Sequence, residues 1–370
     1  MKLSARKILI GVVIIVVIAV FVLRGDQLVE LAETVKQGSL VPLLVAVCTQ
    51  LGKYFAQSFA YKYAFCAVEE SVSAKDMLPV VFGTFFMNTI APSLNLAGTT
   101  LVVDDARRRG IEPGKATSAA LLMQLSVDSA FMCIMVLSFV ALTFTVGLEP
   151  VWFALGLIVL FIVGCMAGLL VLGYKKPETL VKVLTPISRL INRVLVKFKR
   201  NPMKPWVEST VKGFSSAAGM MAKNPKTTAK VFGCSLIASC CELSAFCLVG
   251  VGFGVTSPQP LVCGYVVATL FAMVSITPQG VGVVEAAVTV AFTMFGSSAA
   301  AGIAIGLVYR CIVFWMPFLI GAVLINFTGT FQGKKAPKQE LEGHDAAALE
   351  AAAEGVAQAA PAQAKEPDHA

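Results

Sequence analysis

Long apolar segments recur along the chain and constrain its fold more than any other feature of the sequence. A bilayer core about 30 Å thick is spanned by roughly 20 apolar residues in an α-helix. Segments of about this length lie between charged or Gly/Pro residues at 8–23, 40–67, 77–101, 117–142, 151–174, 228–252, 261–295 and 299–327. Hydrophobic residues make up 57% of the chain and charged residues 14%, a composition that excludes an ordinary soluble domain. The sequence therefore predicts an all-α polytopic integral membrane protein.

The first apolar segment, 8–23, has the position of a secretory signal. No small-residue cleavage site follows it, and its apolar run is longer than a usual signal core. We therefore interpret it as an uncleaved first span.

Positive charge predicts how these segments are oriented. Between residues 175 and 230 there are thirteen Lys or Arg residues and two acidic residues, Glu178 and Glu208. The positive-inside rule places such a stretch in the cytoplasm. We count the spans outward from this stretch and also place the basic N-terminus and the basic residues of 334–338 in the cytoplasm. Segments 77–101 and 261–295 must then each enter and leave the membrane on the same face.

Helix-breaking residues interrupt both of these segments. Pro92 interrupts the first, and the second contains Pro278, Gly280, Gly282 and Glu285. Proline removes a backbone donor, glycine loosens a helix, and a carboxylate at bilayer depth costs about 2.5 to 3.5 kcal/mol on insertion scales. We therefore predict about six full transmembrane helices and two oppositely oriented re-entrant hairpins that turn at Pro92 and Pro278.

The arrangement of ionisable residues around the two breaks favours an inverted repeat. Lys53 and Asp128 stand before and after the first break, and Glu242 and Arg310 stand before and after the second. Inverted repeats place a substrate site near the midplane where broken helices meet, and irregular backbone at that depth lines a wet cavity or is buried in protein. The predicted site therefore lies between the two hairpins.

Charge supplies most of the chemistry available in the membrane. Ionisable groups buried in a membrane either have a function or pair with one another. An ion-pair network that only fixes the register of the helices is therefore an alternative interpretation here. A guanidinium binds phosphate through two parallel hydrogen bonds and keeps its charge, so we assign Arg310 to a phosphate group. Glu285 could cap a half-helix, attract a cation or carry a proton. The predicted substrate-binding residues are Arg310, Glu285, Lys53, Asp128, Glu242, Gly280, Gly282, Pro278 and Pro92.

The basic stretch contains an amphipathic helix. Between 180 and 198, apolar residues recur at helical spacing opposite Lys182, Arg189, Arg193 and Lys197. This pattern is typical of a helix that lies on an anionic lipid surface, and packing against the base of the bundle explains it equally well.

Other motifs offer little catalytic chemistry. The cysteines lie mostly in apolar segments without Cys-x-x-Cys spacing, and both histidines, His344 and His369, lie near the C-terminus. Asp104 and Asp105 could hold magnesium against a diphosphate, but a charged cytoplasmic loop explains them as well. No nucleotide-binding motif is present. We expect no metal or other cofactor and no nucleic-acid partner.

Gly302 and Gly306 form a GxxxG motif on the last apolar segment. This motif favours close packing of helices, either inside one bundle or between two copies in a homodimer.

Several of these residues match the pattern of a known family. The run from Ser275 to Ala287, followed by Tyr309-Arg310 and Phe314-Trp315-Met316-Pro317, resembles the signature of the lysylphosphatidylglycerol synthase transmembrane (flippase-like) family. The first half resembles that family through Asn88, Pro92, Gly98, Arg107 to Arg109 and Asp128, although Gln124 stands where arginine is common. The resemblance covers roughly residues 5–330. It adds Asn88 to the predicted substrate-binding residues.

The resemblance implies a function in lipid transport. In bifunctional members of the family, the membrane part moves an aminoacylated phospholipid and a separate cytosolic domain attaches the amino acid. We therefore expect a translocase for a phospholipid or lipid-linked headgroup, without transferase activity, in the cell membrane with both termini cytoplasmic. Residues 1–331 would form this domain, and the Ala-rich residues 332–370 a disordered cytoplasmic tail.

Three other functions stay open at this point. The first is a membrane-embedded enzyme of lipid or lipid-linked sugar metabolism that uses Asp104 and Asp105 as metal ligands. The second is a small-solute permease coupled to protons through Glu285 or Glu242. The third is an anchor for a separately encoded lipid-modifying enzyme.

Overall fold

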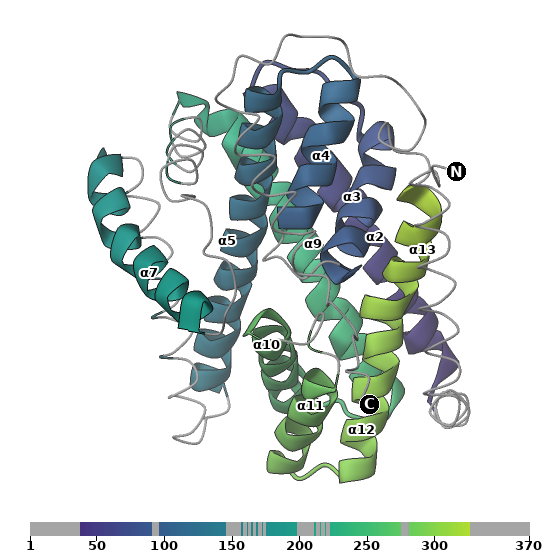
Figure 1. Cartoon of the computed structure of the whole chain (residues 1–370). Coiled ribbons are helices and arrows are strands. Elements are labelled where there is room, and N and C mark those ends of the chain that lie inside the picture. Colours follow the sequence, from purple (N-terminus) through teal and green to yellow (C-terminus); the bar gives the residue numbers. More distant parts are fainter. Residues whose placement is uncertain are drawn as a thin grey trace, which may run out of the picture.

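The described part of the chain is helical. The computed structural model describes residues 38–90, 96–145, 175–197, 223–274, 280 and 282–325, with isolated positions between 157 and 219. Regular structure in these residues consists of helices, without strands (Figure 1). Four helical stretches are long and apolar enough to cross a membrane, namely Leu40–Ala67, Pro113–Ser138, Pro225–Gly252 and Ala299–Leu324. These stretches confirm the predicted all-α polytopic membrane protein.

Each of the four stretches corresponds to a predicted span. Helix α2 (Leu40–Ala67) has the predicted bounds, whereas α5 (Pro113–Thr145) and α9 (Pro225–Gly252) begin a few residues before the predicted ones. Both of these helices begin at a proline, whose missing N–H costs nothing in a first helical turn. The predicted span 8–23 and most of 151–174 lie outside the described residues. The predicted number of about six full spans therefore stays a prediction.

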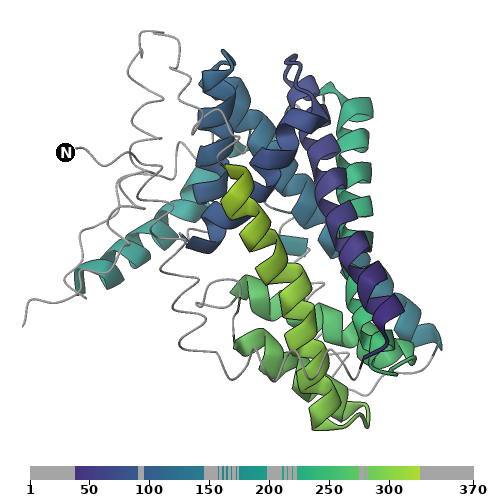
Figure 2. The ribbon, with the colours of Figure 1, turned by 90° about the vertical axis from the view of Figure 1, so that its right-hand side faces the viewer.

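Two pairs of shorter helices pack as antiparallel partners. One pair is α3 (Ala74–Ile90) with α4 (Leu96–Arg108), and the other is α10 (Pro258–Val274) with α11 (Val283–Met294). Figures 1 and 2 show the two pairs in opposite halves of the molecule, with the end of α3, the start of α4, the end of α10 and the start of α11 toward the middle. The pairs overlap the two segments that were predicted to be broken, 77–101 and 261–295, although α3 and α10 begin before these segments and α4 ends after the first one.

The last helical stretch joins the two halves. It consists of α12 (Ala299–Arg310), the π-helical turn η2 (Cys311–Trp315) and α13 (Met316–Leu324). In η2 the Met316 N–H donates to the carbonyl of Cys311, five residues back. Pro317 has no N–H for the carbonyl of Val313 and crowds it, so a wider turn relieves this contact. Because α12 packs on α11 and α13 packs on α3, the stretch connects one helix pair to the other.

Two large apolar cores lie at opposite ends of the long helices. One core contains Leu43 and Ala46 of α2 and Ala245 to Val249 of α9, together with parts of α10, α11 and α12. The other contains Ala60 and Ala64 of α2, Val231 of α9 and parts of α3 and α4. The sequence positions of Lys53 on α2, Glu242 on α9 and Asp128 on α5 fall between residues of the two cores on each helix.

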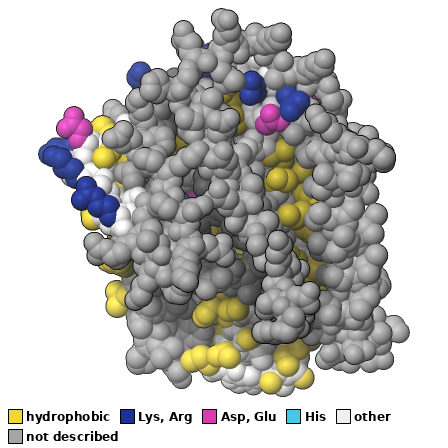
Figure 3. Space-filling model, viewed as in Figure 1, with side chains coloured by type: hydrophobic (Ala, Val, Ile, Leu, Met, Phe, Trp, Pro, Cys, Tyr) yellow, Lys and Arg dark blue, Asp and Glu magenta, His cyan; other side chains and the backbone are white. Residues whose placement is uncertain are grey.

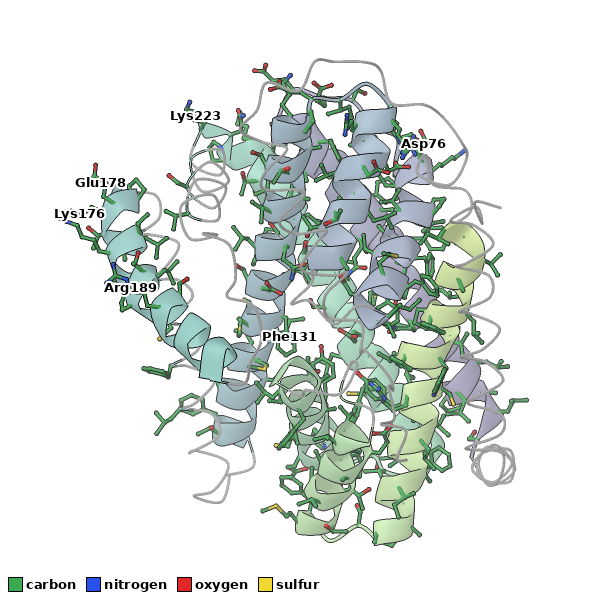
Figure 4. All side chains as sticks on the ribbon, in the orientation of Figure 1. Asp76, Phe131, Lys176, Glu178, Arg189 and Lys223 are labelled. Carbon is green, nitrogen blue, oxygen red and sulfur yellow. The ribbon has the colours of Figure 1, made fainter. Side chains whose placement is uncertain are left out.

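Charged loop residues gather at one end of the bundle. The end where α2 finishes and α5 and α9 begin carries Glu69, Glu70, Arg109, Glu112 and Lys223. Figure 4 shows Lys223 and Asp76 at this end. The loops 253–257 and 295–298 at the other end contain no charged residue. Charge is therefore asymmetric along the bundle axis in the described loops.

The predicted amphipathic helix is α7 (Pro177–Lys197), which lies at the edge of the molecule (Figure 1). Leu180 is buried and packs with Leu172, Val211 and Leu184. Lys176, Glu178 and Arg189 point away from the bundle in Figure 4, and Lys and Arg side chains gather on the same helix in Figure 3. Leu180 thus packs on the chain, and the basic residues Lys176 and Arg189 face outward.

Candidate functional site

A largely buried ion pair joins α2 and α9, which pack along each other. The Nζ of Lys53 on α2 donates to the Oε1 of Glu242 on α9 at 2.6 Å. The two side chains are 13% and 17% exposed. The charges lie between the two apolar cores, so each one compensates the other in a poorly solvated layer. The structure thus brings together two of the predicted site residues from the two halves of the chain.

Aromatic residues surround this pair. Phe246 lies one turn beyond Glu242 on α9, and its ring packs edge to face with Tyr309 of α12 at 4.7 Å and with Tyr265 of α10 at 6.0 Å. On the α2 side, Lys53 Nζ lies 5.7 Å from the centre of the Tyr54 ring. The Glu242 carboxylate acts electrostatically on the phenols of Tyr54, Tyr265 and Tyr309. The pair therefore lies at a junction of four helices.

A second ion pair lies at the inner end of the α10–α11 pair. Arg310, the last residue of α12, approaches Glu285 on the first turn of α11, with 3.4 Å between Nε and Oε1. The Arg310 side chain is 6% exposed and that of Glu285 is 21% exposed. The other carboxylate oxygen of Glu285 accepts a hydrogen bond from the Gly282 N–H at 2.7 Å. Glu285 therefore caps α11 and binds Arg310 at the same time.

The glycines of this turn have conformations that other residues rarely adopt. Gly280 and Gly282 have φ angles of +73° and +87°. A Cβ on Gly280 would lie 2.7 Å from a methyl group of Val284 and 2.9 Å from the Cα of Ala272. Gly280 thus lets the chain pass between α10 and α11, while Gly282 allows the turn that starts α11.

Arg310 also links the two helix pairs. Its guanidinium carbon lies 4.5 Å from the centre of the Phe314 ring in η2. The Phe314 ring in turn packs edge to face with Phe85 of α3 at 6.2 Å, and Phe85 lies one turn before Asn88. A guanidinium above an aromatic face is held in orientation as well as attracted. Arg310 therefore lies where the inner ends of the two pairs approach each other.

Asn88 holds its own helix pair together. Its Oδ1 accepts a hydrogen bond from the Gly98 N–H of α4 at 2.6 Å. A Cβ on Gly98 would overlap the Asn88 amide, which explains the glycine. Asn88 thus has a bracing contact in the structure, and its predicted contact with substrate stays a prediction.

Asp128 is the one remaining predicted site residue that the structure describes. Asp128 on α5 accepts hydrogen bonds from Gln124 at 3.0 and 3.1 Å. Gln124, which stands where the family commonly has arginine, therefore binds this carboxylate as a neutral donor. Pro92 and Pro278 lie outside the described residues.

The two aspartates that were considered as metal ligands are ion-paired. Asp104 binds Arg108 at 2.8 Å and Asp105 binds Arg109 at 2.7 Å, each one turn along α4. Within the described ranges, no group of three or more His, Cys, Asp or Glu side chains could hold a metal ion.

The GxxxG motif packs inside the bundle. A Cβ on Gly302 would lie 2.8 Å from the Cα of Thr289, and one on Gly306 would lie 3.4 Å from the Cα of Glu285. Both glycines thus bring α12 close to α11 and place Arg310 beside Glu285.

Sequence reasoning missed the residues that connect the charged groups. Gln50, Tyr54, Tyr265 and Tyr309 lie in apolar segments as isolated polar side chains, with no motif around them. Their signal was only that an amide or a phenol is rare at the centre of a span. The π-helical turn also had a weak signal, because Pro317 is compatible with an ordinary kink.

An open hollow of about 470 Å³ lies at the charged end of the bundle, lined by Glu69, Glu112, Lys115 and Lys223 among others. Neither of the two intramembrane ion pairs lines it. It is thus a surface feature separate from the candidate site.

Comparison with known families gives one match. The family described as "Lysylphosphatidylglycerol synthase TM region" matches residues 8–321. A search of curated proteins found no match. The matched range includes both helix pairs and every residue of the candidate site, which confirms the resemblance drawn from the sequence.

Proposed function

The chain belongs to the lysylphosphatidylglycerol synthase transmembrane family, and we propose that it moves a phospholipid headgroup across the cell membrane. In this proposal the headgroup phosphate binds Arg310 between two re-entrant helix pairs. The acyl chains stay in the bilayer while the headgroup passes. The family membership supports a lipid-related function in a membrane, and the site geometry supports the route.

One observation carries the proposal: Arg310 is a nearly buried guanidinium at the junction of the two helix pairs. Its partner Glu285 is also held by the Gly282 N–H. A phosphate group could take the place of Glu285 in front of the guanidinium, because a phosphodiester offers two unesterified oxygens and the same single negative charge as a carboxylate. Glu285 would then be free to bind a cationic group of the headgroup.

The shorter helices support the re-entrant assignment. The members of the two pairs have 17, 13, 17 and 12 residues, and a full span needs roughly 20. Their connecting segments contain Pro92 and Pro278 and would turn near the midplane. The positive-inside rule puts the charged end of the bundle in the cytoplasm, and both termini with it.

The other predicted residues would balance charge along the route. Lys53 offers a second cation for the phosphate once it leaves Glu242. The Gln124 amide that donates to Asp128 is neutral, so the negative charge of Asp128 remains available to a cationic group of the lipid. The midplane would thus offer both signs of charge to an anionic or zwitterionic headgroup.

Helix α7 would rest on the anionic surface of the cytoplasmic leaflet. The outward direction of Lys176 and Arg189 supports this assignment (Figure 4). Each basic residue near an anionic leaflet contributes about 1 kcal/mol of attraction.

The test is transbilayer movement of lipid in proteoliposomes. Acyl-labelled phosphatidylglycerol and phosphatidylethanolamine carry a phosphate, and a labelled glycosyl diacylglycerol lacks one. We expect the purified protein to move the first two faster than the third. Arg310→Ala should slow phosphate-lipid movement by at least about tenfold, because a hydrogen bond to a charged group contributes roughly 1.5 to 3 kcal/mol.

Two further variants separate the phosphate contact from folding. Arg310→Lys keeps the charge but loses the planar fork, so we expect partial activity. Arg108→Ala breaks the half-buried pair with Asp104, outside the candidate site, and serves as the matched control, with wild-type rates expected. Wild-type movement by a monodisperse Arg310→Ala protein would exclude Arg310 from the mechanism. Equal rates for lipids with and without phosphate would exclude phosphate recognition.

A further inference from the structure

Buried polar side chains lie near the Lys53–Glu242 ion pair. The hydroxyl of Tyr54 faces the side-chain amide of Gln50 and that of Tyr265 faces Thr269, but none of these three groups makes a well-formed hydrogen bond with a described residue. These three side chains are 1% exposed or less. Gln50 lies one turn from Tyr54 on α2, and both tyrosines lie within the electrostatic reach of Glu242. The ion pair is therefore the centre of a polar pocket inside the apolar bundle.

Such a group of atoms indicates ordered water. A buried donor or acceptor without a partner costs about 1 to 3 kcal/mol, and in native proteins nearly all such groups bind protein or water. A buried water usually makes about three hydrogen bonds to groups of this kind. Water at Gln50, Tyr54 and Tyr265 would lie beside the Glu242 carboxylate. It would give a proton a route to that carboxylate from an aqueous face.

Protonation of Glu242 would change what Lys53 binds. While Glu242 is ionised, Lys53 donates to it at 2.6 Å and its charge is compensated. A proton on Glu242 removes this compensation and leaves the Lys53 ammonium as an uncompensated cation at the bilayer centre. An anionic phosphate is the partner that this cation then favours.

We propose that Glu242 is the proton-binding group that couples lipid translocation to proton movement, and that Lys53 binds the headgroup phosphate when Glu242 is protonated. This inference rests on the proposed function and adds its co-substrate, a proton. On one face a proton passes from water to a carboxylate oxygen of Glu242, and on the other face it returns to water. Lys53 remains protonated throughout. One proton and one singly charged anionic headgroup cross together, so no net charge moves.

The neighbouring groups leave Glu242 as the site of protonation. The titratable groups around it are Lys53 and Tyr54 of α2, Tyr265 of α10, Tyr309 of α12, and the thiols Cys240 and Cys241 of α9 with Cys133 of α5. Phenols and thiols ordinarily keep their protons at neutral pH, and an ammonium does as well. Glu242 is the one carboxylate of this set, so the transported proton is assigned to it.

The experiment measures phosphate-lipid movement in proteoliposomes with equal pH inside and outside. Over about three pH units around neutrality, we expect the wild-type rate to fall by up to about tenfold per unit as the pH rises, because one proton is required. Glu242→Gln imitates the protonated carboxyl group. We expect this variant to translocate lipid at a rate that does not change with pH.

A matched control uses an ion pair outside the bundle core. Glu70→Gln breaks the pair between Glu70 and Lys115, which has a similar distance of 2.8 Å but is more exposed. We expect Glu70→Gln to keep the wild-type pH profile. If Glu242→Gln does not fold, the double variant Lys53→Gln/Glu242→Gln removes both charges and leaves none alone in the core. The double variant should move lipid slowly and without pH dependence.

A second measurement does not depend on transport. In infrared spectra of the purified protein, the band of a protonated carboxyl group should grow as the pH falls, with a component that is absent in Glu242→Gln. A wild-type rate independent of pH, an unchanged profile in Glu242→Gln, or the absence of this component would overturn proton coupling. Absence of lipid movement at every pH would instead overturn the proposed function, and the infrared titration would still decide whether Glu242 binds a proton.

Discussion

At the scale of single residues, Gly280 combines a left-handed backbone conformation with close contacts. Its φ of +73° is strained for any other residue, and a Cβ would overlap Val284 and the backbone of Ala272. We expect Gly280→Ala to destabilise the protein by more than about 2 kcal/mol, which combines backbone strain with overpacking. Thermal unfolding in detergent, followed by fluorescence, measures this loss. The variant should also move lipid more slowly, because Glu285 on the first turn of α11 would shift relative to its partner Arg310 on α12.

Gly282 provides the matched comparison two residues away. Its φ is +87°, but a Cβ there would meet no atom within 4 Å. Gly282→Ala therefore carries only the backbone strain, of about 1 kcal/mol. Equal destabilisation by the two substitutions would contradict the close packing at Gly280.

Residue identity predicted the charged groups of the site but not their partners. Buried charges are rare in apolar segments, so Lys53, Glu242 and Arg310 could be selected from the sequence. The contact between Lys53 and Glu242 joins residues 189 positions apart, and only the packing of α2 on α9 brings them together. The capping contact of Glu285 could be predicted from the local sequence, because a carboxylate three residues after a glycine is a local capping pattern.

At the scale of elements, the π-helical turn η2 depends on Pro317. The proline cannot donate to Val313, and the helix widens over Cys311–Trp315. We expect Pro317→Ala to restore a donor and let the stretch close toward regular α-helix. Amide exchange across residues 311–316 should become slower, because more of its carbonyl groups are then bonded.

Pro79, inside α3, serves as the control for this substitution. Pro79→Ala should change exchange in α3 and leave residues 311–316 as in wild type. Unchanged exchange over 311–316 in Pro317→Ala would show that packing on Phe85 and α3, and not the proline, holds the wide turn. Because η2 carries Phe314 beside Arg310, a closed helix should also slow lipid movement.

Helix bounds followed from local sequence wherever the ends carry strong signals. Gly38 and Ser39 precede α2 and Glu69 and Glu70 follow it, so its bounds could be predicted. The start of α5 was placed too late, because an apolar pattern does not include the polar first turn from Pro113. The turn η2 was not predicted, because its hydrogen-bond shift leaves the hydrophobic pattern unchanged.

At the scale of the whole molecule, the polar layer between two apolar cores is what the sequence could not reveal. Each long helix reads as one continuous apolar segment, although its two ends belong to different cores. The buried polar side chains of Gln50 and Tyr54 lie where the cores meet. The polar layer arises from the way the two halves pack, so no local sequence pattern indicates it.

The arrangement of the two helix pairs predicts which loops share a side of the membrane. Ser73 and Glu112 are exposed at the outer ends of the α3–α4 pair, and Ser257 and Ser297 lie at the outer ends of the α10–α11 pair. Each is replaced by cysteine in a protein whose ten native cysteines have been removed. In intact cells, an impermeant thiol reagent should label Ser257→Cys and Ser297→Cys. Ser73→Cys and Glu112→Cys should react only after permeabilisation, because their end carries the positive charge. If α3 and α4 together formed a full span, Ser73→Cys and Glu112→Cys would react from opposite sides of the membrane. If all four cysteines were labelled from one side, opposed hairpins would be excluded.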